Sequence, residues 1–130
     1  MTDPATGSRS SIVAGSALLR NWSAHDWRGG ILVDALASLD HVIVQTENST
    51  YDIVVVDPES AEVLVRGGAY FPVYRRVRLA GSSLGGSFLK LRSVHPGFRL
   101  EFGTSDGFII TSRVRTVALA PAVTSLSDLM

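Results

Sequence analysis

The residues of this 130-residue chain that are best suited to binding chemistry are arginines placed two apart in strand-like segments. Arg76 and Arg78 follow Tyr74, and Arg113 and Arg115 have the same spacing. Side chains two apart in a β-strand lie on the same face. On single-strand nucleic-acid surfaces, aromatic rings stack on bases while guanidinium groups hold phosphate. The candidate binding residues are therefore Tyr74, Arg76, Arg78, Arg113 and Arg115, with an anion or a nucleic acid as the ligand.

The distribution of charge along the chain supports a second interpretation of the same arginines. Residues 1–65 carry nine acidic and three basic residues, whereas residues 66–115 carry nine basic and two acidic ones. The chain as a whole is neutral. Opposite charges pair across neighbouring strands, and outward charges protect edge strands from pairing with other chains. The arginines therefore form either an anion-binding face or the solvent face of an ordinary sheet, cross-paired with acids of the first half.

A glycine- and serine-rich segment at 81–87 has the glycine spacing of a phosphate-binding P-loop but lacks the other parts of that motif. Ser87 stands where the phosphate-binding lysine is needed. The residues that follow, 88–92, are strand-like, whereas the motif needs a helix N-terminus behind the loop. We interpret the segment as a hairpin loop, with an anion nest of backbone N–H groups as the alternative.

The sequence contains no catalytic or metal-binding motif. It has no cysteine, and His25, His41 and His95 lie far apart, without a second ligand at i+2 or i+4. We interpret these histidines as surface or half-buried polar residues. No G-x-S-x-G elbow occurs. The carboxylates available for glycoside chemistry lie mostly in or beside predicted turns, as solvated charges: Glu47, Asp52, Glu59 and Glu62. The sequence therefore predicts no enzyme, no cofactor and no metal site.

Length and composition predict one domain in the cytoplasm. A hydrophobic content of 45% and a mean hydropathy of +0.23 are ample for a core. The neutral total charge argues against a general nucleic-acid or membrane binder, which would be basic as a whole. No apolar run approaches the roughly 18 residues of a membrane helix, and the N-terminus lacks the basic and apolar regions of a signal peptide.

The chain is predicted to consist of a flexible N-terminal tail at 1–11, a single β-rich domain at 12–120 and a C-terminal tail at 121–130. The segment around Trp22 and Trp27 is apolar enough to pack on the domain or on another subunit. One short amphipathic helix is predicted at about 31–39, where apolar residues recur at helical spacing: Ile31, Leu32, Ala35, Leu36 and Leu39.

Residues 41–119 have the pattern of antiparallel strands joined by turns. His41–Thr46 and Tyr51–Val56 are rich in β-branched residues and flank a polar cluster, which predicts a hairpin with Thr46 opposite Tyr51. Further strands are predicted at 62–66, 73–80, 88–94, 98–102 and 108–119. Phe98, Leu100 and Phe102 are expected inside, with Arg99 outside. The predicted fold is mainly β: a compact antiparallel barrel or sandwich of six or seven strands with one short N-terminal helix.

These patterns favour a non-enzymatic interaction or assembly module of the small β-barrel type, with a protein partner or a second copy of the chain. The low share of charged residues and the high hydropathy fit a chain that buries some surface against a partner. The alternative is an anion- or nucleic-acid-binding module that uses the arginine-rich sheet face. A contiguous positive face would favour anion binding, whereas arginines paired one by one with acids would favour the structural interpretation.

Overall fold

β-Strands make up most of the computed structural model, which describes residues 30–84 and 89–129. The strands are β1 (Ile31–Leu32), β2 (His41–Thr46), β3 (Thr50–Asp57), β4 (Glu62–Gly67), β5 (Phe71–Ser83), β6 (Leu89–Leu91), β7 (Ser93–Val94), β8 (Arg99–Thr104) and β9 (Gly107–Ala120). The helical parts of these described residues are two 3-10 turns, η3 (Val33–Ala35) and η4 (Leu126–Asp128). The predicted mainly β class is confirmed.

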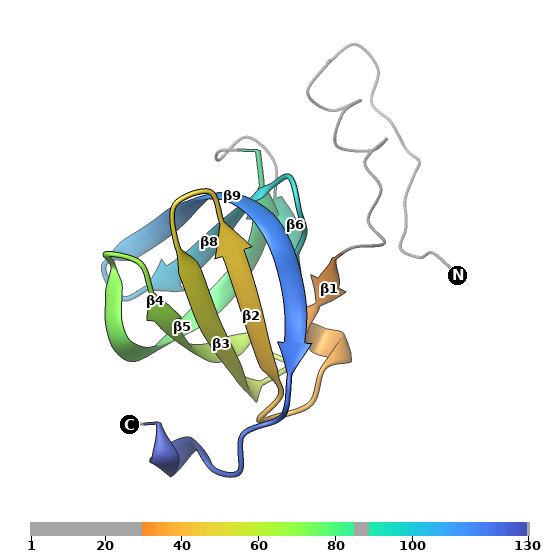
Figure 1. Ribbon diagram of the computed structural model, residues 1–130, viewed down its shortest axis with the longest axis vertical. Coiled ribbons are helices and arrows are strands. Elements are labelled where there is room, and N and C mark those ends of the chain that lie inside the picture. The colour runs from red at the N-terminus through yellow and green to blue at the C-terminus, as the bar shows by residue number, and fades with distance from the viewer. Residues whose placement is uncertain (1–29, 85–88, 130) are drawn as a thin grey trace.

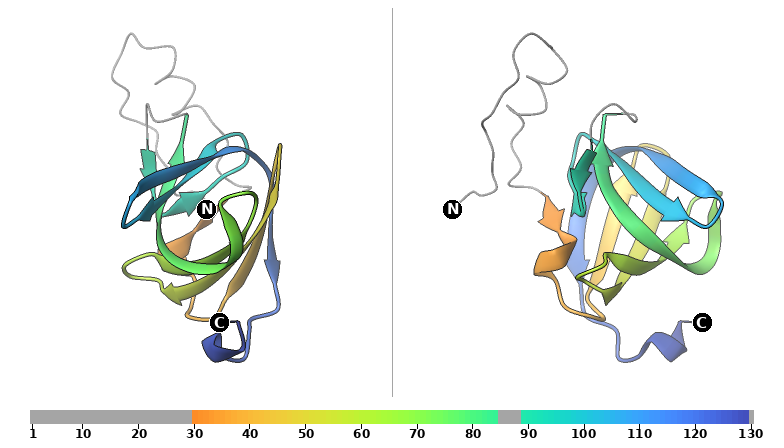
Figure 2. Two further views of the ribbon diagram at one scale, coloured as in Figure 1. Left: turned by 90° about the vertical axis from the view of Figure 1, so that its left-hand side faces the viewer. Right: turned by 180° about the vertical axis from the view of Figure 1, so that it is seen from behind.

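Seven of the strands form one antiparallel sheet in the order β4-β3-β2-β9-β8-β5-β6 (Figure 1). A separate pair is formed by β1 and β7. Strand β4 also pairs with β5, so the sheet curls back on itself and its strands wrap around a common interior (Figure 2). The antiparallel arrangement is therefore as predicted, and β4, β5, β8 and β9 are consecutive neighbours in it.

Three aromatic rings occupy the middle of the core inside this curled sheet. The centroids of Phe71 and Phe102 are 5.4 Å apart, and Tyr51 lies 6.3 Å from Phe102 and 6.4 Å from Phe71. All three distances fall within the range that favours edge-to-face or offset contacts. Around the rings pack mainly β-branched side chains from alternate positions of β2, β3 and β4: Val42, Val44, Ile53, Val55, Val63 and Val65.

The alternation predicted for residues 98–102 is confirmed at its apolar positions. Phe98, Leu100 and Phe102 are all buried. Arg99 is only half-buried, because its guanidinium Nη1 donates a hydrogen bond of 3.2 Å to the carbonyl of Thr111. Arg99 therefore lies along the sheet surface rather than extending fully into solvent.

The predicted hairpin at 41–56 is present, but its register was wrong by two residues. Val44, not Thr46, pairs with Tyr51. The reason is a tight turn, in which the N–H of Thr46 donates to the carbonyl of Ser49 at 2.8 Å and the Thr46 hydroxyl accepts the N–H of Ser49 at 3.1 Å. A shift of two residues leaves every side chain on its face, so the predicted apolar face is still the buried one.

The predicted helix at about 31–39 is wrong. Ile31 begins β1 and pairs with Val94 of β7, and η3 is a single turn that ends at an extended Leu36. A short helix has a high nucleation cost and needs packing along one face. Here Val33 enters the core directly from the 3-10 turn, so the apolar residues are buried without a helix.

The predicted hairpin loop at 81–87 was wrong in its first part, because Gly81–Ser83 complete β5 and pair with both β6 and β8. Gly81 has a φ of 146°, and a Cβ there would lie 2.1 Å from a backbone carbonyl of β6. A side chain would therefore prevent this close strand contact. The strand predicted at 88–94 is divided into β6 and β7 by Arg92, which has a φ of 56°. Residues 85–87 of the proposed anion nest lie outside the described residues.

The structure describes the segment after β9 but not the N-terminal segment before residue 30. The N-terminal tail at 1–11 and the segment with Trp22 and Trp27 lie outside the described residues. At the other end, the N–H of Val123 donates to the carbonyl of Leu39 at 3.0 Å, which attaches the segment after β9 to the domain. Within the described ranges, no helix has the length and apolarity needed to cross a membrane.

Candidate functional site

Four neighbouring strands place one residue each in a row on the outer face of the sheet. Glu62 of β4 pairs with Arg78 of β5, Arg78 with Gly103 of β8, and Gly103 with Phe108 of β9. The flanking residue Val77 is buried, so alternation directs Arg78 outward. The row therefore brings a carboxylate, a guanidinium group, a bare backbone position and an aromatic ring together in that order.

An open cleft of about 310 Å³ lies beside this row, between β4, β5 and the turn that follows β8. Its lining contains two guanidinium groups, three hydroxyls and one carboxylate, so hydrogen-bond donors dominate and the charged groups sum to one positive charge. The lining residues are Ser60, Glu62, Arg76, Val77, Arg78, Gly103, Thr104 and Ser105.

The two arginines of the cleft differ in their partners. Nη1 of Arg76 lies 3.3 Å from Oε2 of Glu62 and forms an exposed ion pair with it. Arg78 is exposed and forms no ion pair or side-chain hydrogen bond with the described residues. Arg78 thus keeps its guanidinium donors for solvent or a ligand, whereas Arg76 shares its charge with a carboxylate.

Tyr74, the aromatic candidate from the sequence, lies outside the cleft. The guanidinium carbon of Arg66 is 4.6 Å from the centre of its ring, so one face of the ring is taken by a cation–π contact. Burial raises the pKa of the Tyr74 hydroxyl, the negative charge of Asp52 raises it further, and Arg66 opposes both effects. One face of Tyr74 is therefore occupied by Arg66, and the ring lies apart from the residues that line the cleft.

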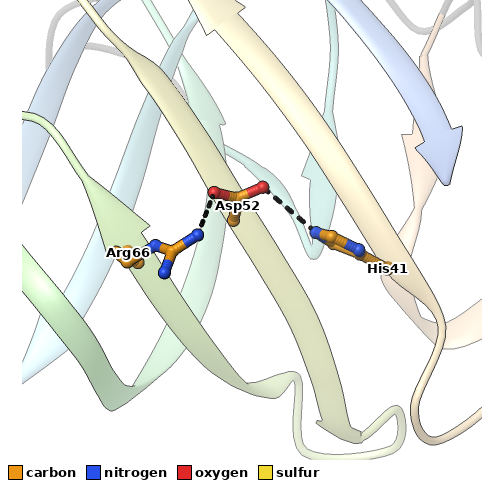
Figure 3. A network of polar contacts seen from close by, with 3 residues as sticks. All are labelled: His41, Asp52 and Arg66. Atoms are coloured by element: carbon orange, nitrogen blue, oxygen red, sulfur yellow. Dashed lines mark hydrogen bonds and ion pairs between the residues drawn. The ribbon is translucent and has the colours of Figure 1, made fainter. Parts of the chain in front are cut away.

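The same cluster continues across β2, β3 and β4 as a chain of polar contacts (Figure 3). Asp52 bridges an imidazole and a guanidinium group: its Oδ1 lies 3.2 Å from Nε2 of His41, and its Oδ2 lies 3.2 Å from Nη2 of Arg66. Such partly exposed pairs contribute at most about 1 kcal/mol each. No serine or threonine hydroxyl among the described residues bonds to His41, so the contact lacks the nucleophile of a catalytic triad.

Arg113 and Arg115 are both exposed on β9, but they do not join the cleft. Arg113 pairs with Arg99, whereas Arg78 pairs with Gly103, four positions further along β8. At the usual rise per strand residue, this separates the two sites by about 13 Å along the strand. Of the predicted binding residues, the structure brings Arg76 and Arg78 together and leaves the other three elsewhere.

The sequence did not identify the residues that complete the site. Phe108 was assigned to the last strand without a role, yet its side chain is 71% exposed. In the observed register the turn is two residues shorter at its start than the predicted one: Thr104 pairs with Gly107 and Gly103 with Phe108, which places Phe108 on the face opposite to that of Phe102. The predicted turn at 103–107 would have paired Phe102 with Phe108 and directed Phe108 inward, so the sequence pattern did not indicate this position. Ser60 and Ser105 come from turns that only the folded sheet places beside Arg78.

His95 was expected at the surface or half-buried and is instead buried, at 3% exposed. The ring fits closely against Gly30, where an added Cβ would overlap it. The described residues contain no cluster of three or more histidine or acidic side chains suited to a metal ion.

No protein-family model, curated protein or solved structure matches this chain. The cleft and the row of residues beside it are therefore the features that indicate a function.

Proposed function

We propose that this protein is a non-enzymatic binding module that holds a phosphate-like anion in the cleft between β4, β5 and β8. The observation that carries the proposal is Arg78, an exposed guanidinium group that lines the cleft and has no ion-pair partner among the described residues. Guanidinium presents a planar fork of donors that matches the oxygens of phosphate.

The surrounding groups support an anionic ligand over a cationic one. The single carboxylate of the cleft, Glu62, is already engaged by Arg76, while the hydroxyls of Ser60 and Ser105 can donate to a bound oxygen. The cleft carries a net positive charge in a chain that is neutral as a whole. Because the site is open to solvent, screening keeps the affinity for a small anion modest.

We infer that the curled sheet serves as a barrel-like scaffold for this site. Strand β4 has a pairing partner on each side, and β5 pairs with β4, β6 and β8 along its length. Residues on paired strands keep their spacing better than residues on loops. Arg76 and Arg78 are therefore held at a fixed separation while their long side chains adapt to the ligand.

Pyrophosphate added to isotope-labelled protein is expected to shift the backbone amide signals of Arg78, Gly103 and Ser105. Arg78→Ala should weaken this binding by roughly five- to ten-fold, because one charge-assisted contact is lost. Arg115→Ala is the matched control, since it removes the same charge from an exposed site outside the cleft. Equal weakening by the two substitutions, or no signal change at the cleft, would refute the proposal.

A second candidate function, assembly with a partner chain, is favoured by the edge strand β6. Leu89 and Leu91 are 41% and 67% exposed on this strand, which lies at the end of the sheet order. An exposed apolar edge strand can pair with another chain. Light scattering should then show an oligomer that Leu91→Lys dissociates, whereas a monomeric wild-type protein at all concentrations would eliminate this candidate.

A further inference from the structure

We propose that the anion of the cleft is the phosphate of a single-stranded nucleic acid whose base stacks on Phe108. This inference rests on the proposed function and adds the class of ligand. The side chain of Phe108 is 71% exposed, and Ile110, two residues further along β9, is 42% exposed. Together they form an apolar surface beside the cleft, in the same outer face as Arg78.

Gly103 lies between Phe108 and Arg78 in the row and has no side chain. The position that a Cβ would take on Gly103 lies 3.7 Å from Cε1 of Phe108 and 4.0 Å from the carbonyl oxygen of Arg78. The ring therefore leans over Gly103, and no side chain stands between Phe108 and Arg78. Two strand spacings separate their backbones, or about 10 Å, a distance that a nucleotide and its phosphates can span.

The chemistry of this row matches the parts of a nucleotide. A base has a flat apolar face that stacks on an aromatic ring, and this stacking tolerates any base. The phosphate next to it would contact Arg78, and the hydroxyls of Ser60 and Ser105 would face the sugar–phosphate backbone. A single strand fits this arrangement, because its bases are free to leave a stack, whereas those of a duplex are not.

Other aromatic residues of the described chain are less suited to this role. Phe71 is buried at 1% exposed, and one face of Tyr74 is covered by Arg66. Tyr70 is 61% exposed, but it precedes Phe71, which pairs with Gly67 at the far end of β4 from the cleft. Phe108 thus combines an open ring with a position beside Arg78, and Tyr70 offers a matched control.

The test compares two fluorescent strands of equal length, an oligothymidylate and an abasic strand with the same phosphates, in anisotropy titrations at low salt. Wild-type protein is expected to bind the oligothymidylate more tightly. Phe108→Ala should weaken that binding by about five-fold to a hundred-fold, the range found for the loss of one base–aromatic stack. Phe108→Ala should leave the binding of the abasic strand unchanged, and Tyr70→Ala should leave the binding of both strands unchanged.

The outcomes separate this inference from the function on which it rests. If Phe108→Ala binds oligothymidylate as the wild type does, while Arg78→Ala binds both strands more weakly, the stacking inference is wrong and the anion site stands. If Phe108→Ala and Arg78→Ala each bind both strands as tightly as the wild type, the stacking inference and the anion site are both wrong. Equal losses in Phe108→Ala and Tyr70→Ala would likewise overturn a specific role for Phe108.

Discussion

Replacing Phe102 by alanine is expected to lower the free energy of unfolding by about 3–5 kcal/mol, the usual cost of truncating a buried phenylalanine. The side chain is fully buried and contacts the rings of Tyr51 and Phe71, so the substitution leaves a cavity and removes two aromatic contacts. Urea denaturation followed by the circular dichroism of the sheet measures the loss.

Phe108→Ala is the matched control for this prediction, because it makes the same chemical change at an exposed site. Its side chain is 71% exposed, against 0% for Phe102. Surface substitutions usually change stability by less than about 0.5 kcal/mol. Similar losses in the two variants would mean that the alternation assigned to β8 and β9 is wrong.

Replacing Gly67 by alanine is the second substitution with a large expected effect. Gly67 has a φ of 141°, and a Cβ there would lie 2.1 Å from the carbonyl oxygen of Thr50 and 2.9 Å from Cα of Tyr51. Both of these are backbone atoms of β3, so rotation of a side chain cannot relieve the overlap. We expect a loss of at least about 3 kcal/mol, the upper end of the usual cost of a strained backbone.

Gly107→Ala is a control that separates the cost of the backbone conformation from the cost of steric overlap with β3. Gly107 has a φ of 135°, and an added Cβ would meet no atom within 4 Å. Its loss of stability should therefore come from the backbone conformation alone, at about 1–3 kcal/mol. If Gly107→Ala is as damaging as Gly67→Ala in the same denaturation experiment, the close approach of β3 and β4 is not what requires glycine at position 67.

The strands were predictable because period-two burial is a local property of the sequence. The alternation of residues 98–102 and of the hairpin at 41–56 needs only one buried face. The register at Thr46 was not predictable from this pattern, since it depends on hydrogen bonds of the Thr46 hydroxyl within the turn. A shift by two residues leaves the apolar pattern unchanged, so the pattern contains no information about it.

The helix predicted at 31–39 is absent, because tertiary contacts override the helical spacing of its apolar residues. Ile31 pairs with Val94 of β7, and Val33 packs in the core. A single 3-10 turn then leads to the extended Leu36. Five apolar residues at helical spacing fit an irregular segment equally well when the segment is short.

The sequence predicted Arg76 and Arg78 of the candidate site, whereas the place of Phe108 depends on the order of the strands. The shared face of Arg76 and Arg78 follows from alternation within one strand. The position of Phe108 beside them depends on β8 lying between β5 and β9, because Arg78 pairs with Gly103 and Gly103 pairs with Phe108. The pairing of opposite charges holds for Arg66 and Arg76, which form ion pairs with acids of the first half, whereas Arg78 forms no ion pair with the described residues.

The salt dependence of oligonucleotide binding is the most direct test of whether Arg78 holds a phosphate. Plotted as the logarithm of affinity against the logarithm of salt concentration, the slope should be negative, with about −0.7 for each phosphate contact to a single strand. Arg78→Ala should flatten it by about 0.7, and Arg115→Ala should leave it unchanged. The same slope in the wild type and Arg78→Ala, or equal flattening in both variants, would show that Arg78 has no specific contact with a phosphate.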